Sequence, residues 1–343
     1  MSARSLPTIT ILTGTLNSHI STFRQVLESV RKQKYPKTLI EHIVMDKGST
    51  NGCIELAKRY GCEADIRHYS PGKEQLSAGL GIQMAKGDLI LVLESDNILT
   101  SRDWLRRMVE PFIQNKKVFC TFSAYNSYWK NMNLTTRYTA LFGSPDPTLY
   151  YLNKTEKMRL DQKHYDKGEV LRETNDYYIV KFNKENLPTL GDNGHMFLKK
   201  SIVKVIQKPE DYIHVDAFSR LLDLGYDTFG VVKNSIIHVQ NPNLIDLVKR
   251  RVEIKKIFYD NKRGKRKYLV FNPSSMNDRI NLFKFVVFSL TFMEPLIESF
   301  CGYIKIRDRA WFLHPVFCFL MVIGYGVSEI KRFISINLKR ISS

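Results

Sequence analysis

Two carboxylates stand at the end of an apolar run. The segment 89–99 reads LILVLESDNIL, so Glu94 and Asp96 follow a stretch with the composition of a buried strand. Because side chains alternate along an extended chain, both carboxylates are expected to point to the same side. Such a pair can hold a hard divalent cation, with phosphate oxygens and water as the remaining ligands. The alternative is a solvated turn after the strand.

Asp46 occupies a similar position in the segment IVMDKGSTNG. At the end of a strand, its carboxylate can accept hydrogen bonds from a nucleoside base or a ribose hydroxyl. The alternative is a turn in which the side chain bonds to its own backbone, or a helix cap.

A glycine-rich polar turn lies further along the chain. Its residues are Gly191, Asp192, Asn193, Gly194 and His195. The two glycines permit a close backbone approach or unusual dihedral angles, and the other three side chains offer donors and acceptors. By itself, such a segment predicts only a polar turn.

Three residues near the end of this region are candidates for acid–base or metal chemistry. His214 and Asp216 stand at the start of a predicted helix, where an aspartate is either a cap or a general base. His238 closes the segment VVKNSIIH and is either a structural residue or a metal ligand that joins the two strand-end acids.

The elements that must position these residues follow from hydrophobic periodicity. Strands are expected at 8–13, 40–45, 64–68, 88–93 and 229–238, and helices at 20–33, 51–61, 74–86 and 211–225. This alternation predicts an α/β fold with a mostly parallel, helix-covered sheet. Ligands bind beyond the carboxyl ends of strands in such sheets, which is where Asp46 and Glu94 fall. Residues 120–190 have weak periodicity and predict loops and short helices over a substrate cleft.

The composition favours a folded chain with an anionic partner. The 343 residues carry a formal net charge of +18, and 43% of them are hydrophobic, which is enough to bury a core. Nucleic acid, a phosphorylated substrate and an anionic membrane surface all suit this charge. The five cysteines are odd in number and contain no CxxC pair. This pattern disfavours a disulfide framework or a zinc site and fits a reducing compartment.

The C-terminal region changes character. Half of residues 249–268 are Lys or Arg, and apolar stretches follow at 282–304 and 311–327. Basic residues beside apolar helices favour anionic lipid headgroups over nucleic acid, for which no recognised motif is present. A two-pass hairpin would put the basic residues of 305–309 outside, against the positive-inside tendency. We therefore favour in-plane or re-entrant helices, with a hairpin as the alternative.

Taken together in chain order, the strand ends, the glycine-rich turn and the acid-bearing helix start resemble glycosyltransferase family 2 over residues 7–240. The most specific segments are SVRKQKYP, MDKGST and AKGDLILVLESDN. The resemblance implies a GT-A fold, a nucleotide-diphosphate sugar donor and a divalent cation, Mg²⁺ or Mn²⁺. It also implies an inverting displacement, in which a carboxylate deprotonates the acceptor hydroxyl.

The resemblance also implies roles by position. The donor-binding positions are Thr13, Asp46, Lys73, Glu94 and Asp96. The positions expected to border the acceptor and donor sugar are Gly191, Asp192, Asn193 and Gly194. Asp96 is the main expected metal ligand, with Glu94 and His238 beside it, and Asp216 is the expected base.

The sequence departs from the family's pattern at three places. Glu94 stands where the first acid of the metal motif is usually Asp, and it either ligates the cation or only supports the second acid. Lys47 stands where a second Asp or a Gly is common. The usual Glu–Asp pair at the base position is absent: the alignment favours His214 as the base, whereas the chemistry favours Asp216.

These features together predict a metal-dependent, inverting, hexosyl-type glycosyltransferase. Residues 1–240 would form the catalytic domain, 241–280 a basic linker or interfacial segment, and 281–343 apolar membrane-associated helices. The expected acceptor is a lipid-linked or cell-envelope glycan at the cytoplasmic face of the cell membrane, and nucleic acid is not an expected partner. The alternatives are a catalytically inactive membrane-bound scaffold and a sugar nucleotidyltransferase.

Overall fold

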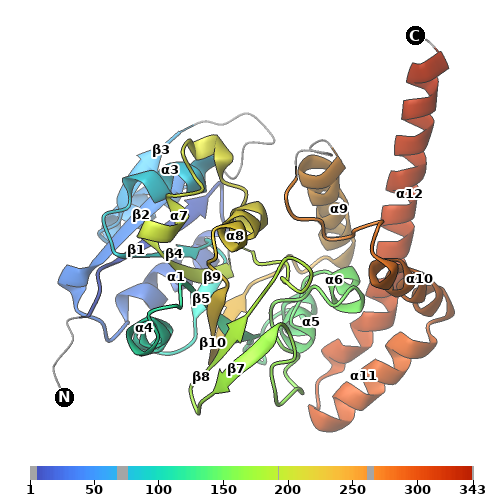
Figure 1. The fold of residues 1–343 in the computed structure, drawn as a ribbon, viewed down its shortest axis with the longest axis horizontal. Coiled ribbons are helices and arrows are strands. Elements are labelled where there is room, and N and C mark those ends of the chain that lie inside the picture. The colour runs from blue at the N-terminus through green and yellow to red at the C-terminus, as the bar shows by residue number, and fades with distance from the viewer. Residues whose placement is uncertain (1–5, 68–75, 192, 261–265, 342–343) are drawn as a thin grey trace. The chain divides into compact units, whose positions relative to one another are not determined.

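The computed structural model describes residues 6–67, 76–191, 193–260 and 266–341 (Figure 1). Its contacts divide the chain into two compact units. Unit 1 comprises Met1–Ser127, Glu156–Met158 and Gln162–Val239, and unit 2 comprises Tyr128–Thr155, Arg159–Asp161 and Gln240–Ser343. Unit 1 ends at Val239, and residues 128–155 belong to unit 2 together with the C-terminal residues.

Among the described residues, unit 1 contains one sheet of ten strands. They are β1 (Ile9–Thr15), β2 (Ile40–Asp46), β3 (Glu63–Ile66), β4 (Leu89–Leu93), β5 (Asn97–Leu99), β6 (Cys120–Asn126), β7 (Glu169–Glu173), β8 (Tyr177–Lys181), β9 (Asn193–Leu198) and β10 (Thr228–His238). Their order is β3-β2-β1-β4-β9-β6-β10-β8-β7, and β5 pairs with β10. The predicted parallel arrangement holds for β3-β2-β1-β4. The complete sheet is mixed, because β9 runs antiparallel to both β4 and β6.

Helices flank this sheet in the described part of unit 1 (Figure 1). They are α1 (Ile20–Arg31), α2 (Cys53–Arg59), α3 (Leu76–Met84), α4 (Trp104–Gln114), α7 (Lys199–Ile202) and α8 (His214–Asp223). The spacing that predicted α1 is the spacing of its buried face, where Phe23 and Leu27 pack with Val44 of β2 and Cys53 of α2. This packing fixes the carboxyl ends of β1 and β2, which contribute to the site below.

The region 120–190 differs from the predicted loops and short helices, because it contains strands β6, β7 and β8 as well as two helices. Strand β6 is buried at all its positions except the half-buried Tyr125, and Thr121 and Ser123 are 0% exposed. The Thr121 hydroxyl donates to the Met108 carbonyl oxygen at 3.0 Å, which satisfies a polar group inside the core. The hydroxyl side chains at these buried positions therefore gave β6 no hydrophobic pattern from which a strand could be predicted.

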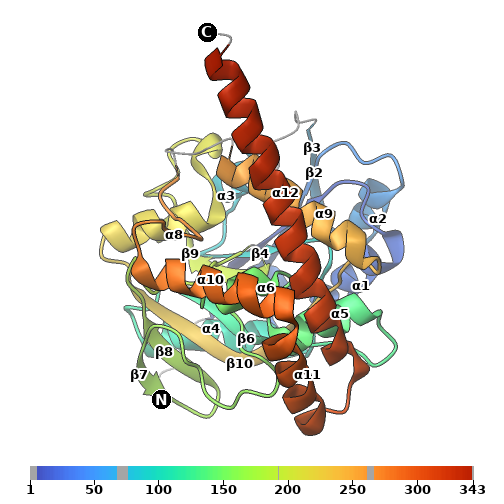
Figure 2. The same cartoon turned by 90° about the vertical axis from the view of Figure 1, so that its right-hand side faces the viewer.

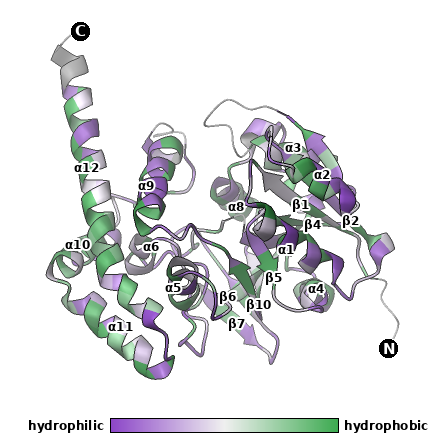
Figure 3. Cartoon of the chain, turned by 180° about the vertical axis from the view of Figure 1, so that it is seen from behind, coloured by the Kyte–Doolittle hydropathy of each residue, from purple (hydrophilic) through white to green (hydrophobic). Residues whose placement is uncertain are grey.

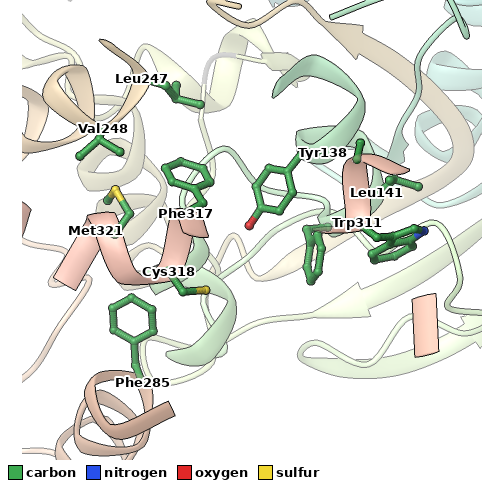
Figure 4. Packing of buried hydrophobic residues seen from close by; sticks show 11 residues of the cluster. Tyr138, Leu141, Leu247, Val248, Phe285, Trp311, Phe317, Cys318 and Met321 are labelled. Atoms are coloured by element: carbon green, nitrogen blue, oxygen red, sulfur yellow. The ribbon is translucent and has the colours of Figure 1, made fainter. Parts of the chain in front are cut away.

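Unit 2 is helical in the part that the structure describes. Its helices are α5 (Leu134–Phe142), α6 (Pro147–Tyr151), α9 (Leu244–Ile254), α10 (Met276–Thr291), α11 (Met293–Lys305) and α12 (Leu313–Ile341), with short 3-10 and π segments at Arg309–Phe312 and Lys255–Asp260. A cluster of buried side chains joins them, including Tyr138, Phe285, Trp311, Phe317 and Met321 (Figure 4). The predicted linker over 241–280 is thus largely helical and contributes Leu247 and Val248 to this core.

Two of the apolar helices form an elbow. The axes of α10 and α11 differ by 82°, and Phe292 between them has a φ of 60°. Figure 2 shows α10 crossing the long helix α12, whose C-terminal part extends beyond the other helices of unit 2. By length and composition, one described helical stretch, Arg309–Asn337, is able to cross a membrane, and the elbow qualifies only if its two helices count as one span.

Polar contacts tie this helical tail to the segment 128–161. Arg137 of α5 binds both carboxylate oxygens of Asp308, which lies between α11 and α12. Glu298 of α11 accepts hydrogen bonds from Tyr150 at 2.6 Å and Tyr151 at 2.7 Å. Because these partners are buried or half-buried, the bonds hold the tail helices as part of one folded unit.

Candidate active site

The candidate residues of unit 1 gather at one edge of the sheet. Strands β1 and β2 end in register, with Thr15 opposite Asp46, and β4 is parallel to β1. Strand β9 is antiparallel to β4, so its first residue, Asn193, lies opposite Leu93, the last residue of β4. The sheet order therefore brings Asp46, the residues after Leu93 and the start of β9 to the same edge.

Asp96 is placed by the short strand that follows it. Strand β5 pairs with the end of β10, with Asn97 opposite His238, and the Asp96 carbonyl oxygen accepts a hydrogen bond from Val239 at 2.9 Å. As a result, the Asp96 Oδ2 atom lies 3.6 Å from His238 Nε2. The Asp96 side chain keeps 35% of its surface exposed, whereas His238 keeps 12%. Two residues that are far apart in sequence thus lie close together.

Glu94 does not follow the extended geometry that was expected of it. The chain turns at residues 95–96, and the Asn97 amide donates to the Glu94 carbonyl oxygen at 3.0 Å. Glu94 Oε2 lies 3.2 Å from the position that a Cβ atom would occupy at Gly14. The alternation that placed the two carboxylates on one side requires an extended chain, so it does not apply across this turn.

The donor set at Asp96 and His238 fits a divalent cation that shares its coordination with a phosphorylated ligand. Two oxygen or nitrogen atoms that bind one cation lie about 3 Å apart at a right angle and about 4 Å apart on opposite sides; the observed 3.6 Å falls within this range. No cluster of three or more His, Cys, Asp or Glu ligands occurs among the described residues. Mg²⁺ and similar ions usually take only one or two carboxylates and complete their shell with phosphate and water.

The two carboxylate oxygens of Asp46 have different surroundings. Its Oδ1 atom accepts hydrogen bonds from the backbone amides of Gly48 and Ser49, both at 2.7 Å, which is the turn that the sequence offered as the alternative. Its Oδ2 atom is buried and has no hydrogen-bond partner within the described part of the chain. A buried oxygen of this kind needs a donor, and a nucleoside base or ribose would provide one.

Two other residues, Thr13 and Lys73, were predicted to bind the donor. Thr13 is 0% exposed, and its hydroxyl lies 3.0 Å from His42 Nε2 inside the sheet. Nearer the edge, a chain of hydroxyls runs from Thr15 to Ser18 at 2.8 Å and from Ser18 to Ser95 at 2.6 Å. This chain links the loop after β1 to the turn after β4. Lys73 and Asp192 lie outside the described residues.

The turn before β9 is fixed by residues that the sequence did not single out. The Gly191 amide donates to Glu156 Oε2 at 3.0 Å, and the same oxygen lies 3.0 Å from His195 Nε2. Glu156 Oε1 lies 3.4 Å from Lys157 Nζ. Glu156 stands in a segment of weak periodicity, and an adjacent Glu–Lys pair is common on exposed surfaces, so no sequence signal marks it as buried.

Charge around Glu156 keeps it anionic. Burial by itself would raise the pKa of its carboxyl, but Lys157 and His195 outweigh this effect and lower the pKa to about 2. Burial lowers the pKa of Lys157, and Glu156 opposes that change.

The two candidate bases lie on the first turn of α8. The N-cap residue is Ile213, which makes no side-chain cap hydrogen bond, so His214 and Asp216 are the first and third residues of the helix. Asp216 is 1% exposed, whereas His214 is partly exposed. Negative side chains are favoured in this part of a helix, and a cap by Asp216 is excluded because the helix has already begun.

Comparisons with known proteins agree with this architecture. The mannosyltransferase PcManGT from Pyrobaculum calidifontis, solved in complex with GDP-Man and Mn²⁺, matches with a TM-score of 0.52 at 12% identity, over 93% of this chain and 87% of that chain. This likeness shows the fold, which is GT-A.

Two weaker structural matches carry no further argument. A mycobacterial protein matches with a TM-score of 0.48 at 16% identity, over 74% of each chain. Glucosyl-3-phosphoglycerate synthase from Mycobacterium tuberculosis matches with a TM-score of 0.45 at 16% identity, over 75% of this chain and 79% of that chain. No curated protein matches the sequence.

The family comparison covers part of the site, because His214, Asp216 and His238 lie beyond the matched residues. The model described as "Glycosyl transferase family 2" matches residues 10–204, more than half of the chain. The match includes the ends of β1, β2 and β4 and the start of β9. This chain belongs to glycosyl transferase family 2.

Proposed function

We propose that the protein is a metal-dependent, inverting glycosyltransferase that moves a hexose from a nucleotide-diphosphate sugar. The acceptor would be a lipid-linked or cell-envelope glycan at the cytoplasmic face of the membrane. The observation that carries this proposal is the pair of Asp96 and His238, which lies at the carboxyl edge of a sheet of glycosyl transferase family 2. GDP-mannose and Mn²⁺, which are present in the mannosyltransferase structure of the same fold, are the first ligands to test.

Each part of the site has a distinct task in this proposal. Asp46 Oδ2 accepts a hydrogen bond from the nucleoside. Asp96 and His238 hold the cation, which neutralises the charge that develops on the leaving diphosphate. Gly191 and Asn193, with Asp192 and Gly194 beside them, border the sugar and the acceptor.

The base takes the proton of the acceptor hydroxyl as the new bond forms on the opposite face of the sugar. An inverting displacement needs one base within hydrogen-bond reach of that hydroxyl. Asp216 is the proposed base, and His214, two residues earlier in the same helical turn, is the alternative.

The tail supports action at a membrane surface. Exposed apolar side chains form one stripe on each helix: Met276, Ile280, Phe283, Val287 and Leu290 on α10; Met293, Leu296, Ile297, Phe300 and Ile304 on α11; Val316, Ile323, Val327, Ile330 and Ile334 on α12. At about 100° per residue, the stripes on α10 and α11 each cover an arc of roughly 100° or less, whereas exposed Phe333 and Ile336 widen the apolar arc of α12 to about 180°. Figure 3 shows the apolar colouring of these helices. The core residues Phe285 and Phe317 lie on the faces opposite to the stripes of α10 and α12.

Such two-sided helices suit an in-plane position, with one face in the protein and the other in lipid. Exposed Arg279 and Lys284 flank the stripe on α10, where they can reach anionic headgroups. The bond between Arg137 and Asp308 argues against a two-pass hairpin. A hairpin would carry Asp308 across the bilayer, but residues 127–133, which connect β6 to α5, span at most about 25 Å, less than the roughly 30 Å of hydrocarbon.

The proposed chemistry is tested by the configuration of the released sugar. The purified protein is incubated with GDP-α-mannose or UDP-α-glucose and Mn²⁺ without acceptor, and slow hydrolysis is followed by proton NMR. The proposal predicts that the β-anomer appears first and that hydrolysis is absent without a divalent cation. Initial release of the α-anomer would contradict inversion, and metal-independent release would contradict the role of Asp96. Complete inactivity with all common donors would favour the scaffold alternative. Formation of nucleoside triphosphate and sugar 1-phosphate from the same donors when pyrophosphate is added would favour the nucleotidyltransferase.

The in-plane arrangement is tested by labelling. Asp308 is buried, so a cysteine is placed at the exposed Arg307, in a Cys301→Ser background that removes the one exposed cysteine. An impermeant maleimide added to intact cells should leave Arg307→Cys unlabelled and should label it after lysis. Labelling in intact cells would establish the hairpin.

A further inference from the structure

Three ionisable side chains are buried together beneath the turn that borders the sugar site. Glu156, Lys157 and His195 are 7%, 3% and 1% exposed. Burying a charged group costs on the order of several kcal/mol unless nearby partners compensate. A buried apolar side chain would fill the same space more cheaply, so the presence of these groups calls for a function.

The Glu156 carboxylate holds the turn at both ends. Its Oε2 atom accepts the Gly191 amide at 3.0 Å on one side and lies 3.0 Å from His195 Nε2 on the other. Lys157 Nζ lies 3.4 Å from the second oxygen, Oε1, and 5.5 Å from the centre of the Phe122 ring. One side chain thus binds the residues immediately before and after the turn.

The turn held in this way contains a β-bulge. Val92 pairs with His195 and Leu93 pairs with Asn193, so Gly194 is the extra residue between them. Gly194 has a φ of 77°, and a Cβ atom there would lie 2.6 Å from Ile236 Cδ1. Bulges re-aim the side chains beside them and are frequent next to active sites. Here the bulge places Asn193 opposite Leu93, the residue before Glu94.

We propose that Glu156 is a positioning residue for sugar transfer: it fixes the bulge at Gly194 and thereby holds Asn193 in place for the donor sugar and the acceptor. This inference rests on the proposed glycosyltransferase activity. Glu156 acts through Gly191 and His195 and does not itself touch the substrate.

The backbone around Glu156 is held independently of its carboxylate. The Met158 amide donates to the Ala124 carbonyl oxygen at 2.8 Å, and the Tyr165 hydroxyl donates to the Glu156 carbonyl oxygen at 3.2 Å. Variants of the side chain are therefore expected to fold. Replacing a buried ion pair as a whole by apolar residues of similar volume is often neutral or stabilising.

The test compares two double variants. Glu156→Leu/Lys157→Met removes the ion pair and the acceptor for the Gly191 amide, while Glu156→Gln/Lys157→Met keeps an oxygen that can accept that bond. The first is expected to lower kcat/KM for transfer by about 10- to 100-fold, as for other residues that orient a site. The second should recover part of this loss. The rise in melting temperature caused by GDP or UDP with Mn²⁺ should be unchanged in both, because Asp46 and Asp96 are untouched.

Tyr165→Phe is the matched control, because it removes a contact to the same residue but leaves the carboxylate in place. It is expected to transfer at the wild-type rate. Wild-type transfer by Glu156→Leu/Lys157→Met, an equal loss in Tyr165→Phe, or a parallel loss of nucleotide binding would each overturn the inference. Should the leucine variant not fold, the glutamine variant decides, since it must then show a reduced rate with normal nucleotide binding.

Hydrogen exchange separates this inference from the proposed function. In the wild-type protein, the Gly191 amide should be protected by its bond to Glu156, and it should exchange faster in Glu156→Leu/Lys157→Met. Unchanged exchange would overturn the positioning role whatever the enzyme catalyses. A wild-type protein that neither binds nor hydrolyses nucleotide sugars would instead refute the proposed function.

Discussion

The same residue type has different surroundings at each point of the candidate site. Asp46 uses one oxygen to form a turn and keeps the other buried at the strand end. Asp96 keeps a third of its side chain exposed and lies beside His238. Asp216 is buried on the first turn of α8. These surroundings suit a nucleoside contact, a cation ligand and a base, in that order.

The identity of the base leads to a prediction for two neighbouring variants. Asp216→Asn should lower transfer by about 10²- to 10⁴-fold, because an amide cannot accept the proton of the acceptor hydroxyl. His214→Gln should have a much smaller effect. Initial rates of transfer are measured at saturating donor, and nucleotide-induced melting shifts serve as the control for intact donor binding. A larger loss in His214→Gln would assign the base to His214.

His42 gives a prediction for stability against pH. Burial lowers its pKa from 6.5 to about 4, so the unfolded chain takes up a proton in this interval while the folded protein does not. Stability should therefore fall as the pH drops from 6.5 towards 4, by up to about 3 kcal/mol from this residue.

This effect is isolated by difference. Urea unfolding at pH 7 and pH 4.5 is compared for the wild type, for His42→Gln and for His164→Gln, whose histidine side chain is 76% exposed. The wild type and His164→Gln should lose more stability on acidification than His42→Gln does. Equal losses in all three proteins would show that His42 binds its proton equally well in both states.

At the scale of elements, the bulge in β9 depends on a glycine. Gly194→Ala should destabilise the protein by about 2–4 kcal/mol. Alanine is strained in the left-handed conformation of this position, and its Cβ atom would clash with Ile236. Gly225 is the matched control: its φ is 81°, but nothing lies within 4 Å of an added Cβ. Gly225→Ala should cost only about 1–2 kcal/mol. Free energies of unfolding that do not differ between the two variants would contradict the clash.

Elements with a clear hydrophobic pattern, either an apolar run or apolar residues at helical spacing, were predictable from the sequence. Strands β1, β2 and β4 and helix α1 lie within a few residues of the predicted ranges, because burial dictated their composition. Helix α4 was not predicted, although Trp104, Met108 and Phe112 have helical spacing, and its internal Pro111 breaks the pattern. Strand β6 was not predicted because two of its buried positions carry hydroxyls, of which that of Thr121 donates to the Met108 carbonyl oxygen inside the core.

The site was predictable only in part, for a reason that lies in its contacts. Asp46 and His238 end strands and Asp96 lies in the turn just after β4, so their positions follow from strand ends and sheet order. The turn at Ser95–Asp96 and the burial of Glu156 depend on pairing between distant segments, which leaves no local pattern. Tertiary contacts of this kind cannot be inferred from periodicity.

At the scale of the whole molecule, the tail is a folded unit with an apolar outer surface. The predicted in-plane arrangement leads to a test with vesicles. Phe283→Ser/Phe300→Ser should reduce binding to anionic vesicles by about 10²- to 10⁴-fold, since burying each Phe contributes about 1.5–3 kcal/mol. Leu171→Ser, which changes a 50% exposed residue of β7, is the control and should bind normally. Sedimentation with phosphatidylglycerol vesicles measures the binding, and an unchanged affinity of the double Phe variant would contradict the role of the stripes.

The central claim is that Asp96 binds a nucleotide-diphosphate sugar through a divalent cation. It is tested most directly by the melting temperature of the wild type, Asp96→Asn and the control Asp88→Asn, which changes the exposed acid at the other end of β4. Each protein is heated with a panel of donors, with and without Mn²⁺. The account predicts that one donor stabilises the wild type and Asp88→Asn only when Mn²⁺ is present, and that Asp96→Asn shows no such gain. Equal stabilisation of Asp96→Asn, or stabilisation that does not need the metal, would contradict it.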